Sequence, residues 1–406
     1  MVSNAMGSTL GLLVGGALNR TNDPASSGFR YYFYMTMAFY FAAALMTFFA
    51  YNPMETPKQK EYRGRNLDKL RNLDFGGYIL LCSGLVLFCV GLSYYKSPYE
   101  FTDSKVIGTF ASGLVLCICL VVYETMFKKD GLFHHGLFRS GRNFPIALFC
   151  VFAEGAGFFS ANIYFAFQVG TFYEHDALLI GLRYAIVLLA AMTGAIVTGF
   201  YCAQSRRVRW YTVFAYALFV AFFIAMATTN RTTDKPTWGY AVMLGLSLGM
   251  TLTTLISAAQ LSTPPELIAV ASGLIISVRS IGATIAIAIY NALFTDQMSN
   301  LPNNIANAVI PKGLSPDVLP GFIGGLSTHN QTLLGSLPGI TPEIIQAGSD
   351  ALLDTYVIGF RRVWITAGCF VAVAGIVAVF LQDPKSEFNS KIDAPLEEDD
   401  KLYDRN

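Results

Sequence analysis

The chain has 406 residues, of which 53% are hydrophobic and 14% charged, and its formal net charge is +1. A typical soluble domain carries about 25% charged residues, so this composition excludes an ordinary soluble protein and indicates an all-α chain that crosses a lipid bilayer several times. The near-neutral charge excludes the basic surface that nucleic-acid binding requires, and no nucleic-acid partner is expected.

The apolar runs of the chain predict ten helical spans, because about 20 apolar residues in a helix cross a hydrocarbon core ~30 Å thick. The first run is too short to cross alone and indicates the remaining part of a longer helix. In chain order, the runs cover residues 5–18, 31–50, 76–95, 106–123, 144–167, 178–200, 211–228, 238–258, 268–294 and 363–381.

The first span repeats glycine on a four-residue spacing, at Gly7, Gly11 and Gly15, with Gly16 directly beside the last of them. Glycines at this spacing remove side chains from one helical face, so that two helices can touch or slide. The pattern resembles the antiporter motif of major facilitator superfamily exporters, although Leu12 stands where that motif has a proline. These glycines are therefore candidate residues of a helix interface.

The loops between the spans differ in their content of Lys and Arg. Loops 51–75, 124–143 and 201–210 together carry more basic residues than the alternating loops, and short basic loops mark the cytoplasmic side. This places the C-terminus in the cytoplasm. Three N-x-S/T sequons fall on loops that the count places outside. They begin at Asn19, Asn230 and Asn330, and we expect a glycan on Asn330 because the other two lie close to the membrane.

One external loop, residues 295–362, is far longer than a helix connection requires. Within it, Ser315-Pro316-Asp317 and Thr341-Pro342-Glu343 each place a hydroxyl N-cap before a proline and an acid. These are signals of helix N-termini. We expect two helices lying over the outer face, which act either as a packed structural cap or as a lid or partner surface.

Two charges fall near the middle of predicted spans: Glu154 and Arg279. An unpaired Arg at the centre of a bilayer costs at least ~2.5 kcal/mol, so opposite charges at matching depth are expected to pair. The pair is either static or one that changes when substrate or a proton binds, and the sequence leaves both readings open. Arg183 lies nearer the outer end, where Glu174 or Asp176 can pair with it.

Aromatic and polar residues follow Glu154 on the same span. Phe158, Phe159, Tyr164, Phe167 and Gln168 either line a cavity for an apolar, oxygen-rich compound or pack against other helices. The sequence contains no HExxH, GxSxG or Walker-type motif and no CxxC zinc spacing. We therefore expect no enzyme activity, no metal and no cofactor.

Several further motifs resemble one family over essentially the whole chain. Leu73-Asp74-Phe75-Gly76-Gly77 is similar to the entry of the seventh helix in fourteen-helix drug:proton antiporters. The rest are similar to the fungal trichothecene efflux pump family and its siderophore-transporter relatives. They are Phe138 to Phe144, Glu154-Gly155, Phe158 to Ser160, Gly181 to Tyr184, Ser262 to Ala269, Ser277 to Gly282 and Leu337 to Ile345.

The resemblance implies a major facilitator fold in which the ten spans correspond to helices five to fourteen, so that the first four are absent. Residues 1–50 would then be the remnant of the N-terminal half, and residues 51–143 a cytoplasmic linker with two intervening helices. Residues 144–381 would form the six-helix C-terminal half, with loop 295–362 outside, and residues 382–406 a disordered cytoplasmic tail.

The resemblance also implies the function. We expect proton-coupled efflux of a small fungal secondary metabolite or toxin, with the chain inactive by itself because four helices are missing. The cell membrane is the expected location, with a vacuolar or vesicle membrane as the alternative. Two other readings stay open at this stage: a siderophore-iron transporter, and a non-transporting membrane fragment or interaction protein.

Overall fold

The computed structural model describes residues 2–20, 28–51, 74–94, 99, 102–128, 135–139, 141–264, 267–327 and 331–384. Over these residues the chain is almost entirely helical, and nine of the described helices are long and apolar enough to cross a membrane. This confirms the prediction of an all-α polytopic membrane protein. The first helix, with 17 residues, is the short span that the sequence also set apart.

The helix bounds follow the predicted spans closely, and the structure adds several short helices. The described elements are α1 Val2–Leu18, α2 Gly28–Ala50, α5 Phe75–Ser93, α6 Ser104–Val122, α7 His135–Arg139, α8 Asn143–Phe172, α9 Ala177–Ser205, α10 Arg209–Ala227, α11 Asp234–Leu261, α12 Ile268–Met298, α13 Leu301–Val309, α14 Leu319–Ser327, α15 Gln331–Ser336 and α16 Pro342–Ala378. A π-helical turn, Tyr123–Phe127, continues α6.

Several helices begin where an acid or a hydroxyl satisfies the free N–H groups of the first turn. Asp74 accepts from the Gly77 N–H at the start of α5, and Asp176 accepts from the Leu178 N–H at the start of α9. Thr341 accepts from the Ile344 N–H at the start of α16. The predicted N-cap at Thr341 is thus confirmed, and Asp74 and Asp176 are further N-caps that the structure adds.

Six helices, α8 to α12 and α16, pack into one bundle around a shared hydrophobic core. Two of its helix pairs touch backbone to backbone at glycines. An added Cβ on Gly245 or Gly249 of α11 would clash with carbonyl oxygens of α9, and one on Gly155 of α8 would clash with the carbonyl oxygen of Arg279 in α12. Small residues at helix contacts are how membrane helices approach closely.

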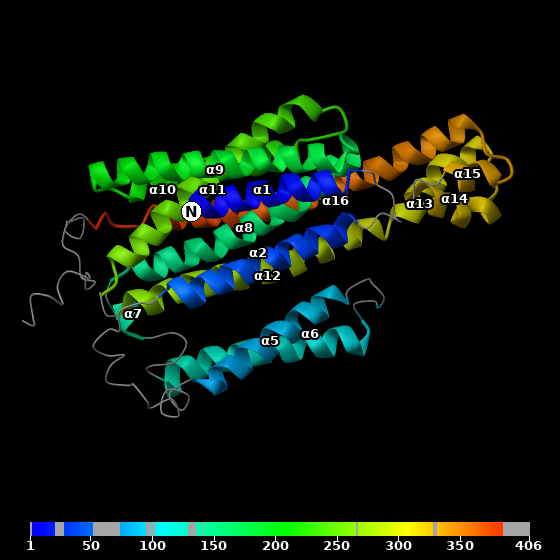
Figure 1. Cartoon of the computed structure of the whole chain (residues 1–406). Coiled ribbons are helices and arrows are strands. Elements are labelled where there is room, and N and C mark those ends of the chain that lie inside the picture. Colours follow the sequence, from blue (N-terminus) through cyan, green and yellow to red (C-terminus); the bar gives the residue numbers. More distant parts are fainter. Residues whose placement is uncertain are drawn as a thin grey trace, which may run out of the picture.

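The α5–α6 pair forms a hairpin at one side of this bundle, next to α12 (Figure 1). Its two helices also meet at glycines, because Gly91 faces the backbone of Phe110 and Gly113 faces the backbone of Phe88. The hairpin is therefore a second, separate packing unit.

The first two helices differ in how they contact the bundle. Helix α1 packs along α9, whereas α2 is exposed over almost its whole length in the described structure.

Residues 299–327 and 331–341 fold into short helices at one end of the bundle, which is the end predicted to lie outside (Figure 1). They share a small core of their own with the first turns of α16. We call this unit the cap; its buried residues are Ile305, Val309, Leu314, Phe322, Leu326, Leu334, Ile344 and Leu352.

The sequence placed two helix starts in this region, and both are found. Ser315 precedes a 3-10 turn, Pro316–Val318, that leads into α14, and Thr341 caps α16. One part of the prediction was wrong: the helix that begins at Pro342 does not lie over the surface but runs unbroken to Ala378. No proline interrupts it after its first residue, so nothing ends the helix where it enters the membrane.

Candidate functional site

Glu154 and Arg279 meet inside the bundle, as their matching depth predicted. The Arg279 Nε lies 2.5 Å from the Glu154 Oε2, and its Nη2 lies 3.0 Å from Oε1, so the contact is bidentate. Glu154 is completely buried, whereas 22% of the Arg279 side chain is exposed. A fork-to-fork contact fixes the guanidinium in one orientation. One edge of that guanidinium therefore remains open to a ligand.

The glycines beside these two residues set the geometry of the pair. Gly155 faces the Arg279 carbonyl oxygen, and Gly282 faces the carbonyl oxygen of Phe152 on the opposite helix. The two helices thus lie closest at the level where Glu154 and Arg279 project. The sequence alone did not show this reciprocity, because a helical pattern gives depth but not rotation about the helix axis.

Two of the predicted aromatic residues lie against the pair. The Arg279 guanidinium carbon is 4.8 Å from the Phe158 ring centroid and 5.8 Å from that of Phe159. The two rings are half-buried and meet edge to face. Aromatic faces attract a cation, more strongly where water is excluded. These rings therefore form an apolar border to the open edge of Arg279.

The other three members of the predicted cavity lie elsewhere. Phe167 and Tyr164 pack in a cluster of rings, which contains Tyr290, Phe294, Tyr356 and Phe360. Gln168 is 1% exposed; its Oε1 accepts from the Trp364 indole N–H at 2.7 Å, and its Nε2 donates to the Thr229 hydroxyl at 2.6 Å. Both amide atoms of Gln168 are engaged, so this residue joins α8 to α16 and to the segment after α10 rather than facing a ligand.

Tyr184 of α9 is a site candidate that the sequence reasoning missed. Its ring is buried, and its hydroxyl has no hydrogen-bond partner among the described residues. A buried hydroxyl without a partner is costly and calls for an explanation, such as a ligand or a water molecule that it binds. No sequence signal distinguished this tyrosine from the many others in the chain.

Three of the four candidate glycines of α1 face a neighbouring helix. An added Cβ on Gly16 would lie 2.9 Å from the Ala177 carbonyl oxygen of α9, whereas Gly11 and Gly15 face the Tyr32 ring of α2. Gly7 has nothing within 4 Å. Only Gly16 therefore permits a close backbone contact with the six-helix bundle.

Arg183 is buried at the outer end of α9, in a cluster of charged and aromatic residues of which the sequence predicted only part. Its Nη2 lies 2.7 Å from an Asp234 oxygen and 3.6 Å from a Glu174 oxygen, and its guanidinium carbon is 4.7 Å from a Trp238 ring centroid. The expected alternative partner, Asp176, instead accepts from Arg20 of the segment after α1. The cluster ties α9 to α11, and we interpret it as structural.

Two of the three sequons lie in the described structure. The Asn19 side chain donates to the Gly15 carbonyl at 2.8 Å, and the Asn230 side-chain oxygen accepts from the hydroxyls of Thr232 and Thr233. Asn330 lies outside the described residues. Glycosylation at any of the three stays a prediction.

A bundle of membrane-length helices with a buried charge pair at its centre is the architecture of a polytopic transporter. Residues 19–405 match the family described as fungal trichothecene efflux pump (TRI12). The match covers nearly the whole chain, and the protein belongs to this family. Family membership confirms the resemblance, and it also confirms the expectation that the chain is not an enzyme.

Curated relatives agree with this assignment. The chain is 22% identical over 380 residues to a trichothecene efflux pump of Trichoderma arundinaceum, which covers 90% of this chain and 62% of that relative. It is 25% identical over 338 residues to the MFS-type transporter pigP of Monascus ruber, covering 79% of this chain and 58% of the relative. The chain thus spans about three fifths of the length of these relatives.

Proposed function

We propose that the protein is a membrane exporter of an apolar, oxygen-rich secondary metabolite, driven by exchange for protons. The observation that carries the proposal is the bidentate Glu154–Arg279 pair, whose guanidinium lies against two phenylalanine rings and keeps its Nη1 outside the contact with Glu154. An Arg N–H donates to a carbonyl, hydroxyl or epoxide oxygen, and the rings of Phe158 and Phe159 contact the apolar skeleton.

Exchange for protons follows from the way Glu154 holds Arg279. While Glu154 is charged, it fixes the guanidinium in the orientation that a substrate oxygen needs. A proton on Glu154 removes its charge and weakens the bidentate contact, so the guanidinium is no longer held in place. Substrate and proton are then bound in turn, which is the requirement of an antiporter.

The test is export of a radiolabelled trichothecene from vesicles that carry this chain extended upstream by four membrane spans, measured with and without an uncoupler. We expect Glu154→Gln, which resembles the protonated state, to reduce export to the level of uncoupler-treated vesicles while the folded amount is unchanged. Arg279→Lys should have the same effect, because Lys cannot form the bidentate contact. The control is Gly273→Ala, since Gly273 on the same helix has nothing within 4 Å. Uncoupler-sensitive export by Glu154→Gln would refute the mechanism.

We also propose that the 406-residue chain gives no energised efflux by itself. Alternating access needs two halves that rock around a central site, and the described helices supply one six-helix half plus α1, α2 and the α5–α6 hairpin. The vesicle assay should therefore compare this chain with a version extended upstream by four membrane spans, about 150 residues at typical helix and loop lengths. Export by the shorter chain alone would overturn this part of the proposal.

The location and orientation proposed from the sequence are the cell membrane and a cytoplasmic C-terminus. The siderophore alternative has a direct test in the same strains. The test measures whether uptake of an iron-loaded siderophore requires the protein. Such uptake, with no trichothecene export, would show that the protein is a siderophore-iron transporter and not the proposed exporter.

A further inference from the structure

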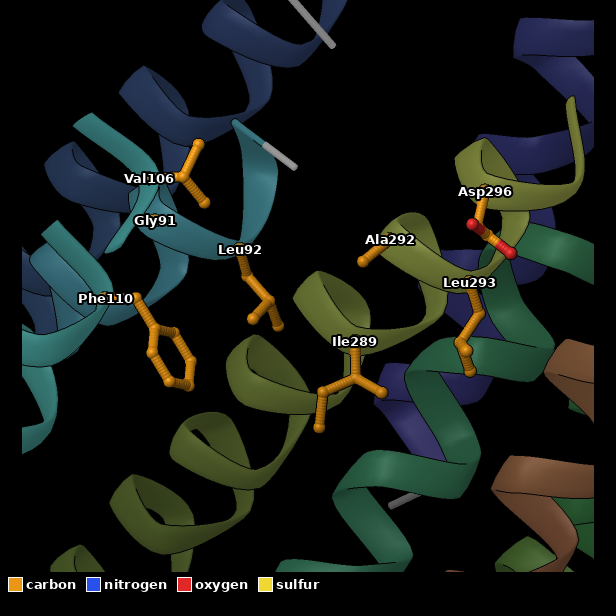
Figure 2. A pocket seen from close by; sticks show the side chains of 8 residues that line it. All are labelled: Gly91, Leu92, Val106, Phe110, Ile289, Ala292, Leu293 and Asp296. Carbon is orange, nitrogen blue, oxygen red and sulfur yellow. The ribbon is translucent and has the colours of Figure 1, made fainter. Parts of the chain in front are cut away.

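A cavity lies between the α5–α6 hairpin and α12, apart from the charge pair. Its volume is about 420 Å³, and it is lined by Gly91, Leu92, Val106, Phe110, Ile289, Ala292, Leu293 and Asp296. In Figure 2, Leu92 of α5 points toward Ile289 and Ala292 of α12, and Asp296 lies at one end of the lining. Apart from this one acid, the lining is apolar.

The cavity lies at the level where a membrane helix leaves the hydrocarbon. Gly91 and Leu92 are in the last turn of α5, Val106 is in the first turn of α6, and Asp296 is in the last turn of α12. All three helix ends belong to the side predicted to be outside. An apolar space at this depth opens toward acyl chains below and headgroups above, so its chemistry matches that of an amphipathic molecule.

The cavity also lies at a seam between two packing units. The principal contact of the hairpin with the six-helix bundle is between α5 and α12, and a single weak hydrogen bond joins them there, from the Cys89 thiol to the Thr284 carbonyl oxygen at 4.0 Å. Within each unit, by contrast, glycines bring the helices into backbone contact. A seam with apolar walls in a bilayer is filled by hydrocarbon rather than by water.

The polar end of the cavity carries both signs of charge. The Arg362 Nη1 of α16 donates to the Asp296 Oδ2 at 2.8 Å, and both side chains are partly exposed. A carboxylate beside a guanidinium complements a headgroup that holds an amine and a phosphate: the amine donates to Asp296, and the phosphate accepts from Arg362. An anionic headgroup lacks the amine, and a fully methylated one lacks the N–H donors.

We propose that this cavity binds one phospholipid with a primary-amine zwitterionic headgroup, phosphatidylethanolamine, through an acyl chain between α5 and α12 and a headgroup at Asp296 and Arg362. The lipid fastens the hairpin to the six-helix bundle. The site is separate from the one proposed for export and does not depend on it.

The test is retention of isotopically distinct lipids by the purified full chain, measured by native mass spectrometry. In a direct competition, the unmodified chain should keep phosphatidylethanolamine in preference to phosphatidylcholine and phosphatidylglycerol. Equal retention of the three would overturn the proposal without any variant. Displacement of the lipid by the radiolabelled trichothecene would also overturn it, because the cavity would then be a substrate site.

Substitutions inside and outside the cavity test the same lipid retention at the level of single residues. Ala292→Trp places an indole in the cavity and should lower retention of phosphatidylethanolamine by roughly tenfold or more. The matched control is Ile276→Trp, an exposed position of the same helix outside the cavity, which should leave retention unchanged. Asp296→Asn should abolish the preference over phosphatidylcholine. A monodisperse Ala292→Trp protein that retains as much lipid as the unmodified chain would refute the site.

Discussion

The α8–α12 and α9–α11 contacts of the six-helix bundle are built in the same way but place their ion pairs differently. In both, glycines bring the backbones together, at Gly155 and Gly282 in the first pair and at Gly245 and Gly249 in the second. The first contact holds the Glu154–Arg279 ion pair at the level of its glycines, whereas the Arg183–Asp234 pair of the second lies at the outer end of the helices, away from Gly245 and Gly249. The second contact shows that such helices pack closely in their middle without an ion pair at that level.

This difference bears on why the charges are present. Burying an ion pair costs desolvation energy that the attraction between the charges repays only in part, and apolar replacements are often at least as stable. Since Gly245 and Gly249 bring α9 and α11 together with no ion pair at their level, close packing in the middle of the bundle does not require Glu154 and Arg279. Their presence at the centre of the bundle is therefore better explained by function.

The largest expected effect comes from removing one charge of the pair. Arg279→Leu strands the fully buried Glu154 and should lower the free energy of unfolding by about 3–5 kcal/mol. Glu154→Leu should cost less, because the partly exposed Arg279 can turn its charge toward its open edge. The double variant should recover most of the loss. The measurement is thermal unfolding in detergent as a double-mutant cycle, and strictly additive losses would contradict the coupling.

A smaller effect is expected from filling the glycine contacts. Gly155→Ala and Gly249→Ala each place a methyl group against a facing carbonyl oxygen, and overpacking of this kind costs about 1–3 kcal/mol. If the two contacts are equivalent in packing, the two losses will be similar. Gly155→Ala alone should also impair export, because it separates Glu154 from Arg279.

The control for the glycine variants is again Gly273→Ala. Nothing lies within 4 Å of a Cβ at this position, so the change should be neutral or stabilising by up to ~1 kcal/mol, the difference in helix propensity. A loss at Gly273 equal to the loss at Gly155 would show that helix contacts are not the cause.

The smallest effect concerns Asp74 of the α5–α6 hairpin. This acid caps the N-terminus of α5 and is not part of an ion pair inside the six-helix bundle. Burial acts to raise the pKa of the Asp74 carboxyl, but hydrogen bonds from the Gly77 N–H and the Tyr123 hydroxyl, with the Lys128 charge, lower it below its usual value. A depressed folded-state pKa stabilises the fold above the unfolded value of ~3.9, and the stabilisation is lost as the pH falls through the folded pKa.

Asp74→Asn should therefore lower the midpoint of thermal unfolding slightly at neutral pH, because Asn still caps the helix but lacks the charge. The difference between the two proteins should shrink to zero as the medium becomes more acidic than the lowered pKa. A difference that is constant over the whole pH range would show that the carboxylate charge does not matter. A difference that grows as the pH falls would show that the charged Asp74 carboxylate does not stabilise the fold in the way proposed.

The sequence predicted the parts of this structure that depend on composition along the chain. Long uncharged runs fixed the helices, and the depths of Glu154 and Arg279 fixed their pairing, because lipid leaves a buried charge few partners. The hydroxyl–proline–acid pattern at Thr341 likewise fixed the start of α16.

The parts that were missed depend on rotation about helix axes and on contacts between distant segments. Gln168 follows Glu154 on α8, yet its amide is engaged by Trp364, which lies far along the chain. Arg183 pairs with the predicted Glu174 but lies closer to Asp234 of α11, which the sequence did not indicate. Tyr184 became a candidate only when its hydroxyl was found without a partner. None of these contacts leaves a periodic signal in the sequence.

The unbroken helix α16 has a consequence for how this family can vary in length. Its 37 residues join the cap to the membrane bundle, and Arg231 of the segment before α11 binds Asp350 and Asp354 on the part within the cap. One residue inserted between Asp354 and Phe360 would turn the cap by about 100° around the helix axis. That turn would carry Asp350 and Asp354 away from Arg231. Insertions and deletions between Asp354 and Phe360 should thus not be tolerated.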